Sequence, residues 1–131
     1  MNTPAAPDPA FEAFIIPAFK RKAASVTAID VRNLTSYADM IMIIEGTSKR
    51  QVSSIAEYLI RDLKKQDITA LGVEGVKEGE WALLDYGDVI IHVFESRKKD
   101  FFNIEGLWAD APRMDLTAYE NKYEQPENDD D

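Results

Sequence analysis

Two short apolar runs in the second half of the chain flank a Gly-Asp pair, and this pattern constrains the fold more than any other feature. The runs are Trp81–Tyr86 and Val89–Phe94, with Gly87-Asp88 between them. Each run is about six residues long and rich in aromatic and β-branched side chains, which favours β-strands. Gly adopts positive φ without steric cost, so the pattern predicts a β-hairpin. In the register that this turn imposes, the opposed pairs are Tyr86 with Val89, Asp85 with Ile90, Leu83 with His92, and Trp81 with Phe94.

Because strand side chains alternate between faces, this register divides the hairpin into two surfaces. One surface is almost entirely apolar and suits a core: Ala82, Leu84, Tyr86, Val89, Ile91 and Val93. The other mixes aromatic residues with a carboxylate and the single histidine: Trp81, Leu83, Asp85, Ile90, His92 and Phe94. An apolar surface that carries polar groups is typical of a binding site. The alternative is that the chain's own helices cover it, with Asp85 reaching water at the strand end.

Upstream of the hairpin, the sequence predicts a helix, two strands and a second helix. Apolar residues recur at helical spacing over 10–24, where Pro17 either kinks one helix or starts a shorter one. Residues 26–34 and 40–45 are typical of strands, and the second of these is apolar on both faces, as in a central strand. Ser48 stands three residues before Gln51, a capping-box pattern that starts an amphipathic helix ending near residue 66.

The remaining elements complete a single α/β domain. A short strand is expected at 70–73, and apolar residues within 97–108 are spaced for a final helix that packs on the sheet. The element order α-β-β-α-β-β-β-α predicts a mixed five-stranded sheet flanked by helices. Residues 1–9, rich in Pro and Ala, and the acidic residues 113–131, which lack apolar periodicity, are expected to be disordered, leaving 10–112 as the domain.

Charge and composition exclude several classes of function. The net charge is −9, of which residues 115–131 contribute −6 through seven acidic residues and one lysine. Basic clusters are small and scattered, so direct binding to nucleic-acid phosphates is not indicated. There is no cysteine, which excludes disulfides, thiolate metal sites and a cysteine nucleophile. No apolar run reaches the ~20 residues of a membrane helix, and the N-terminus fits neither a signal nor a transit peptide, so a cytoplasmic protein is expected.

Three separated motifs resemble the Iojap, or ribosomal silencing factor, family. They are GEWALLDYGDVIIHVF, the later FFNIEGLWADAP, and the upstream AIDVRNLTSYADMIMIIEGTSKRQVSSIAEYL, and the resemblance extends over roughly residues 20–112. It implies a domain similar to the nucleotidyltransferase-like fold. It also implies a protein that binds the large ribosomal subunit through ribosomal protein fourteen, blocks association with the small subunit and represses translation under nutrient limitation. Where the family usually has an acidic pair, this chain has Ala24-Ser25, which puts any role of that pair in doubt.

The resemblance places the partner-binding surface at the hairpin. The candidate binding residues are Trp81, Asp85, Tyr86, Asp88, His92 and Phe94. Binding energy usually concentrates in a few buried aromatic residues, while charges tune encounter and register. We expect Asp85 and Asp88 to meet lysine or arginine on a basic ribosomal protein, which is a better partner for this acidic chain than bare RNA. The sequence leaves open a homodimer through an exposed sheet face.

Two alternatives to a ribosome-binding protein remain. The first is a nucleotidyltransferase-like enzyme, because Gly46-Thr47-Ser48 occupies the strand-to-helix junction at which such enzymes use a Gly-Ser pair. Those enzymes also need two carboxylates one residue apart to hold two metal ions, and no such pair follows here. Asp85 and His92 could form a general base, but no nucleophile accompanies them. We therefore predict no catalysis, metal or cofactor. The second alternative is a regulatory domain with another protein partner.

Overall fold

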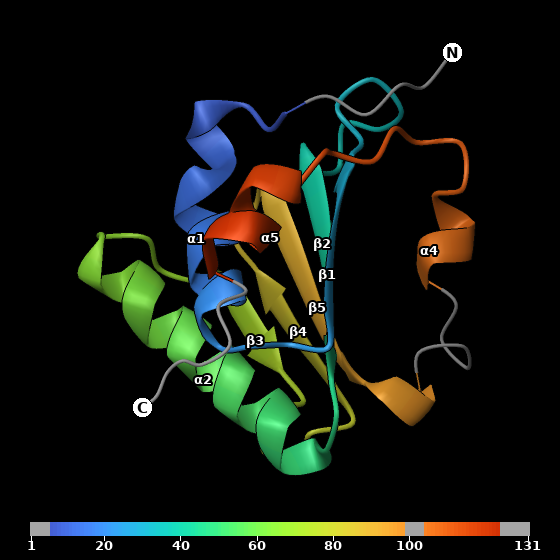
Figure 1. The fold of residues 1–131 in the computed structure, drawn as a ribbon. Helices are drawn as coiled ribbons and strands as arrows, with labels where there is room; N and C mark the ends of the chain where they lie inside the picture. The colour runs from blue at the N-terminus through green and yellow to red at the C-terminus, as the bar shows by residue number, and fades with distance from the viewer. Residues whose placement is uncertain (1–5, 99–103, 124–131) are drawn as a thin grey trace.

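The computed structural model describes residues 6–98 and 104–123, and a five-stranded mixed sheet lies at its centre (Figure 1). The strands are β1 (Ser25–Asp30), β2 (Met40–Gly46), β3 (Gly72–Glu74), β4 (Trp81–Asp85) and β5 (Val89–Glu95). Their order in the sheet is β1-β2-β5-β4-β3. Strands β2 and β5 are parallel, and each of the other neighbouring pairs is antiparallel. The predicted mixed α/β sheet is confirmed.

The register of the β4–β5 hairpin is the one that the sequence predicts. Leu83 opposes His92, and the flanking pairs match as well. Gly87 has φ +87 at the turn, a conformation that L side chains rarely adopt. The two faces therefore divide as expected, because a slip by one residue would have exchanged them.

Helices α1 and α2 cover one face of the sheet together with α5, while α4 lies on the other side (Figure 1). Helix α1 (Glu12–Lys20) follows a short 3-10 turn, η1 (Pro9–Phe11), and continues through Pro17 instead of starting there. Helix α2 (Lys49–Lys65) buries the predicted stripe, which comprises Val52, Ile55, Ala56, Leu59 and Leu63.

The junction between β2 and α2 is packed too tightly for a side chain at Gly46. A Cβ added there would lie 2.9 Å from Cγ2 of Val52. Ser48 caps the helix, since its Oγ accepts a hydrogen bond from the Gln51 amide at 3.1 Å. The Gln51 side chain reaches back to accept from the Thr47 amide at 2.6 Å. The predicted capping box therefore forms in a variant: the Gln51 side chain bonds to the amide of the residue before the N-cap, whereas in the usual pattern it bonds to the amide of the N-cap itself.

The chain beyond β5 departs from the sequence prediction. In place of one helix over 97–108, the structure has η2 (Ser96–Lys98) and α4 (Ile104–Leu107), and residues 99–103 of the prediction lie outside the described residues. The first strand ends at Asp30 instead of residue 34, and β3 lies two residues later than expected at its start. No helix among the described residues has both the length and the apolar character needed to cross a bilayer.

The prediction of a disordered tail from residue 113 is wrong for residues 113–123. Arg113 forms a β-bridge with Ile29, and the Met114 amide donates to the Ala28 carbonyl at 2.8 Å. Leu116 is 6% exposed, and α5 (Thr117–Tyr123) follows it. The apolar residues here are too few to form a periodic stripe, yet each has a partner on the folded domain. Residues 1–5 and 124–131 of the predicted disordered ends lie outside the described residues.

Candidate partner-binding site

Three aromatic rings on the hairpin form one stack on the face opposite α2. Trp81 lies 5.4 Å from Phe94 and 5.8 Å from His92 between ring centroids, and His92 lies 5.9 Å from Phe94. Trp81 and Phe94 are opposed across the strands, and His92 is two residues from Phe94 on the same side. The alternation of the strands thus brings together three of the six predicted site residues.

A hydrogen bond fixes the orientation of two of these rings. Nε1 of Trp81 donates to Nδ1 of His92 at 2.9 Å. Burial lowers the pKa of His92 to about 4, because the charged form would lose its hydration. The imidazole is therefore neutral near pH 7, with its proton on Nε2 and Nδ1 acting as the acceptor. This histidine orders the stack.

The chain itself covers much of this face. Ile90, His92 and Phe94 are buried, and Ile90 and Phe94 belong to a second core cluster that includes Ile41, Ile43 and Ala111. Trp108, which follows α4, packs against the same cluster. The alternative left open by the sequence therefore holds over β2 and β5. His92 and Phe94 support the face from beneath in this structure, and neither forms its accessible surface.

The accessible part of the face lies over β4, the edge strand β3 and the hairpin turn. Trp81, Leu83 and Asp85 are half-buried. Glu74 opposes Leu83 in the register and is exposed, as is Asp88 in the turn. We call the set Glu74, Trp81, Leu83, Asp85 and Asp88 the hairpin face. Glu74 and Leu83 were not among the predicted site residues. The hairpin register already placed Leu83 on this side, but the β3 pairing that adds Glu74 was not evident from the sequence.

The three predicted residues around the turn have different surroundings. Oδ1 of Asp85 accepts from the Gly87 amide at 2.8 Å, which stabilises the turn. The Asp88 carbonyl accepts from the amides of Asp39 and Met40, which ties the turn to the start of β2. Tyr86 lies on the opposite face, where its ring meets Phe14 edge-on at 5.5 Å. Burial raises the pKa of the Tyr86 phenol. Of these three residues, only Asp85 is on the side of β4 that carries Trp81 and Leu83, and Asp88 lies at the turn.

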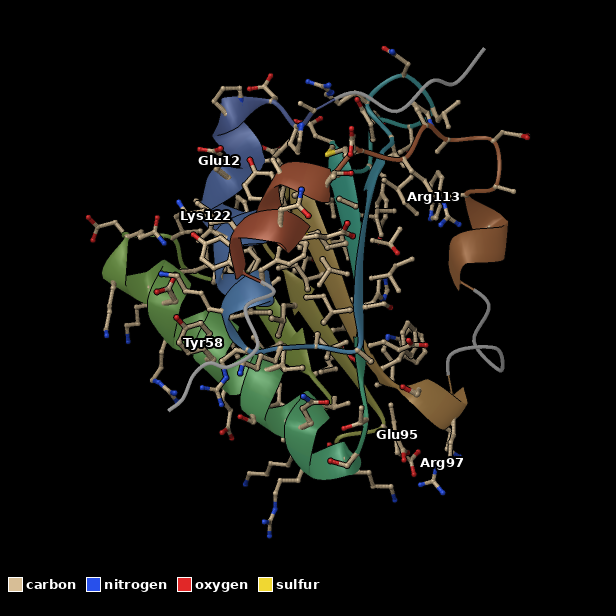
Figure 2. The ribbon with its side chains drawn as sticks, in the orientation of Figure 1. Glu12, Tyr58, Glu95, Arg97, Arg113 and Lys122 are labelled. Atoms are coloured by element: carbon tan, nitrogen blue, oxygen red, sulfur yellow. The ribbon has the colours of Figure 1, made fainter. Side chains whose placement is uncertain are left out.

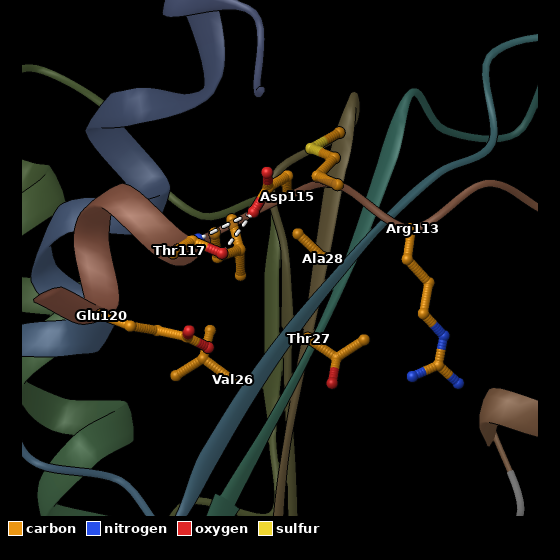
Figure 3. A pocket seen from close by; sticks show the side chains of 9 residues that line it. Val26, Thr27, Ala28, Arg113, Asp115, Thr117 and Glu120 are labelled. Carbon is orange, nitrogen blue, oxygen red and sulfur yellow. Dashed lines mark hydrogen bonds between the residues drawn. The ribbon is translucent and has the colours of Figure 1, made fainter. Parts of the chain in front are cut away.

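A groove elsewhere on the molecule contains none of the predicted site residues (Figure 3). It has a volume of about 470 Å³ and lies beside β1, between the strand and the segment that leads into α5. Asp115 accepts from the Thr117 amide at 3.0 Å and from its Oγ1 at 2.6 Å, and these bonds lower the pKa of Asp115. The carboxylate thus caps α5. The Thr117 hydroxyl and the Asp115 carboxylate are thus both engaged at the start of α5.

The strand-to-helix junction at Ser48 lacks the set of metal ligands that phosphoryl transfer needs. Ser48 is engaged as the helix cap. At the carboxyl end of β5, Glu95 is buried and accepts two hydrogen bonds from Arg97, at 2.9 Å from Nε and 2.5 Å from Nη2 (Figure 2). Among the described residues, no group of three or more His, Asp or Glu side chains is arranged to hold a metal ion. A single buried carboxylate does not make a two-metal site.

Comparison with known proteins decides the family. The sequence model of the family described as "Ribosomal silencing factor during starvation" matches residues 4–131. The chain belongs to the ribosomal silencing factor family. It is 36% identical over 96 residues to the ribosomal silencing factor RsfS of Halalkalibacterium halodurans, covering 73% of this chain and 82% of that protein. The Bacillus subtilis protein of the same name is 35% identical, with coverages of 73% and 81%.

Solved structures agree with this assignment. A crystal structure of a Chromobacterium violaceum protein has a TM-score of 0.72 and 33% identity, covering 75% of this chain and 82% of that one. One from Bacillus halodurans also has a TM-score of 0.72, at 30% identity, covering 82% and 97%. The maize chloroplastic Iojap protein is 27% identical over 72% of this chain, which spans 41% of its length. The resemblance seen in the three motifs is therefore confirmed at the level of the ribosomal silencing factor family.

Proposed function

We propose that this silencing-family protein binds the large ribosomal subunit in the cytoplasm through ribosomal protein fourteen, using the hairpin face. Bound there, it blocks association with the small subunit by occupying space, and so represses translation when nutrients are limited. No chemical step is required. The observation that carries the proposal is the composition of the hairpin face: Trp81 and Leu83 are half-exposed on one side of β4, Glu74 and Asp85 add carboxylates on that side, and exposed Asp88 adds one at the turn.

This surface suits a basic protein partner. Half-exposed aromatic and aliphatic side chains supply binding energy when a partner removes them from water. Nearby carboxylates favour encounter with lysine and arginine and disfavour partners that carry acidic groups. The stack beneath the face holds Trp81 in one orientation, so little side-chain entropy remains to be lost on binding.

The direct test is co-sedimentation of purified variants with large subunits. Asp88→Lys changes a charge at the exposed turn while leaving the backbone bonds of Asp88 intact. We expect weaker binding, mainly from repulsion, with an unchanged melting temperature. The matched control is Glu120→Lys, which makes the same charge change on α5, on the side of the sheet opposite the hairpin face, and should bind normally.

A second pair of variants tests the apolar part of the face. Leu83→Ala should weaken binding, whereas Val73→Ala, an exposed apolar residue on the opposite face of β3, should not. Trp81→Ala should cost roughly 2 kcal/mol or more of binding. It also removes the donor to His92, so its stability must be measured alongside. Normal co-sedimentation of both Asp88→Lys and Leu83→Ala would show that the hairpin face is not the contact.

A further inference from the structure

The outer surface of α2 and the end of α1 carries the opposite charge to the rest of the chain. Residues 20–22 and 49–65 contain eight basic and two acidic residues, a net charge of +6. The whole chain carries −9, so the remaining residues carry −15. In the sequence these basic residues form short clusters, and 26 residues separate the cluster at 20–22 from the one that begins at residue 49. The fold brings the clusters to one surface.

Specific contacts join the two segments. Nη2 of Arg21 donates to Oγ of Ser54 at 2.7 Å, and its guanidinium lies 5.1 Å from the centre of the Tyr58 ring. Nε2 of Gln51 donates to the Lys22 carbonyl at 3.2 Å. Arg21 is therefore held beside the middle of α2, where Tyr58 lies on the helix surface (Figure 2), and Lys22 is held beside the first turn of α2. The seven exposed cations Lys20, Arg21, Lys22, Arg50, Arg61, Lys64 and Lys65 make up what we call the basic face.

Lys49 of α2 pairs with Glu80 at 3.3 Å, but three other cations along the helix are not neutralised within the described chain. Arg50, Arg61 and Lys65 form no ion pair with a carboxylate of the described residues. By helical geometry Arg50, Ser54, Arg61 and Lys65 lie along one side of α2, with about 22 Å between the first and the last. Like charges at Arg61 and Lys65, four residues apart, disfavour the helix slightly. Glu57 lies on the same side of α2, four residues before Arg61, and offsets part of this repulsion. The cations on this side outnumber it, and an anionic ligand would relieve the repulsion that remains.

We propose that the basic face binds the phosphodiester backbone of RNA, without reading its sequence. A line of guanidinium and ammonium groups on a helix surface suits a row of phosphates, because each contact releases counterions from the nucleic acid. The inference rests on the proposed function, since the ribosomal subunit supplies the RNA. Helix α2 packs on the sheet face opposite the hairpin face, so the two surfaces serve different partners.

The test measures fluorescence anisotropy of a labelled RNA duplex of about 16 base pairs, a common footprint for backbone recognition. Arg50→Glu/Arg61→Glu reverses two exposed charges on the basic face. Lys98→Glu/Arg113→Glu makes the same change in net charge away from α2 and is the matched control. The wild type and the control should bind at low salt. The Arg50/Arg61 variant should bind at least about tenfold more weakly, and its slope of log K against log salt should fall by about two.

Several outcomes would overturn the proposal: no duplex binding by the wild type at low salt, or an equal loss in both double variants. Tighter binding of the wild type to phosphatidylglycerol vesicles than to the duplex would point to a membrane surface instead. The test is independent of the hairpin face, because Asp88→Lys should retain duplex binding. Loss of subunit binding in Asp88→Lys with normal duplex binding supports both proposals. A different outcome is that the basic face binds the duplex while Asp88→Lys and Leu83→Ala still bind subunits normally. That outcome would contradict the proposed function and leave the RNA-binding proposal standing.

Discussion

Trp81 and His92 are joined across the β4–β5 pair by a hydrogen bond from the indole Nε1 to the imidazole Nδ1, at 2.9 Å. The bond requires a neutral imidazole, because a protonated Nδ1 cannot accept. It links the half-exposed Trp81 of the hairpin face to the buried core cluster beneath it. The orientation of the main aromatic residue of the proposed binding surface therefore depends on the protonation of a buried group.

This dependence predicts a loss of stability in mild acid. The pKa of His92 is about 4 in the folded protein, below its ordinary value of 6.5. Between these values the unfolded chain binds more protons, so the free energy of unfolding falls as the pH decreases from 6.5 towards 4. The full effect is on the order of 3 kcal/mol. Urea unfolding at pH 7, 6, 5 and 4 would measure it.

The matched variant for the acid effect is His92→Asn. Its amide oxygen can still accept from Trp81, but the group does not titrate. The variant should lose less stability than the wild type between pH 6.5 and 5, whatever its stability at pH 7. If the free energy of unfolding fell by the same amount in both proteins over this pH range, His92 would not be the responsible group.

The segment that leads into α5 should contribute to the stability of the domain. Leu116 is 6% exposed and belongs to the core cluster under α1 and α2. Leu116→Ala should destabilise the protein by roughly 2 kcal/mol or more. Leu107→Ala removes the same atoms from a residue that is 73% exposed and should change stability by less than about 0.5 kcal/mol. Equal melting temperatures for both variants would contradict the docking of this segment.

The cap at the start of α2 gives a further prediction. Ser48→Ala should cost about 1 kcal/mol of stability, because the Gln51 amide loses its acceptor. Ser48→Thr and Ser48→Asp, which retain an acceptor oxygen, should recover most of the loss in thermal unfolding. Subunit binding should stay intact in the folded Ser48→Ala protein. A nucleotide-dependent activity that disappeared in Ser48→Ala without loss of stability would revive the enzyme hypothesis.

The end of α2 holds a residue in an unfavourable conformation. Asp67 has φ +65 just after the helix and places a negative charge near the negative end of the helix dipole. Asp67→Gly should raise the free energy of unfolding by about 0.5–1 kcal/mol. Asp67→Asn removes only the charge and should gain less. A lower melting temperature for Asp67→Gly would mean that the Asp67 side chain makes a stabilising contact.

The sequence alone determined the elements whose signals are local. The hairpin register follows from a glycine turn between two strands, and the division of its faces follows from strict alternation. Helix α2 follows from a cap residue and an apolar stripe. Each of these signals lies within a few residues of the element that it specifies.

Only the tertiary structure decided which surfaces are open. The sequence cannot show that Trp108 and Ala111 pack with the core cluster that contains Phe94, because that contact depends on how the chain returns after β5. Nor can the sequence show that Leu116 is buried in the core, since a single apolar residue produces no hydrophobic periodicity. The basic face has the same origin: its charges lie at and just after the end of α1 and along α2, and a contact between Arg21 and Ser54, 33 residues apart, brings them together.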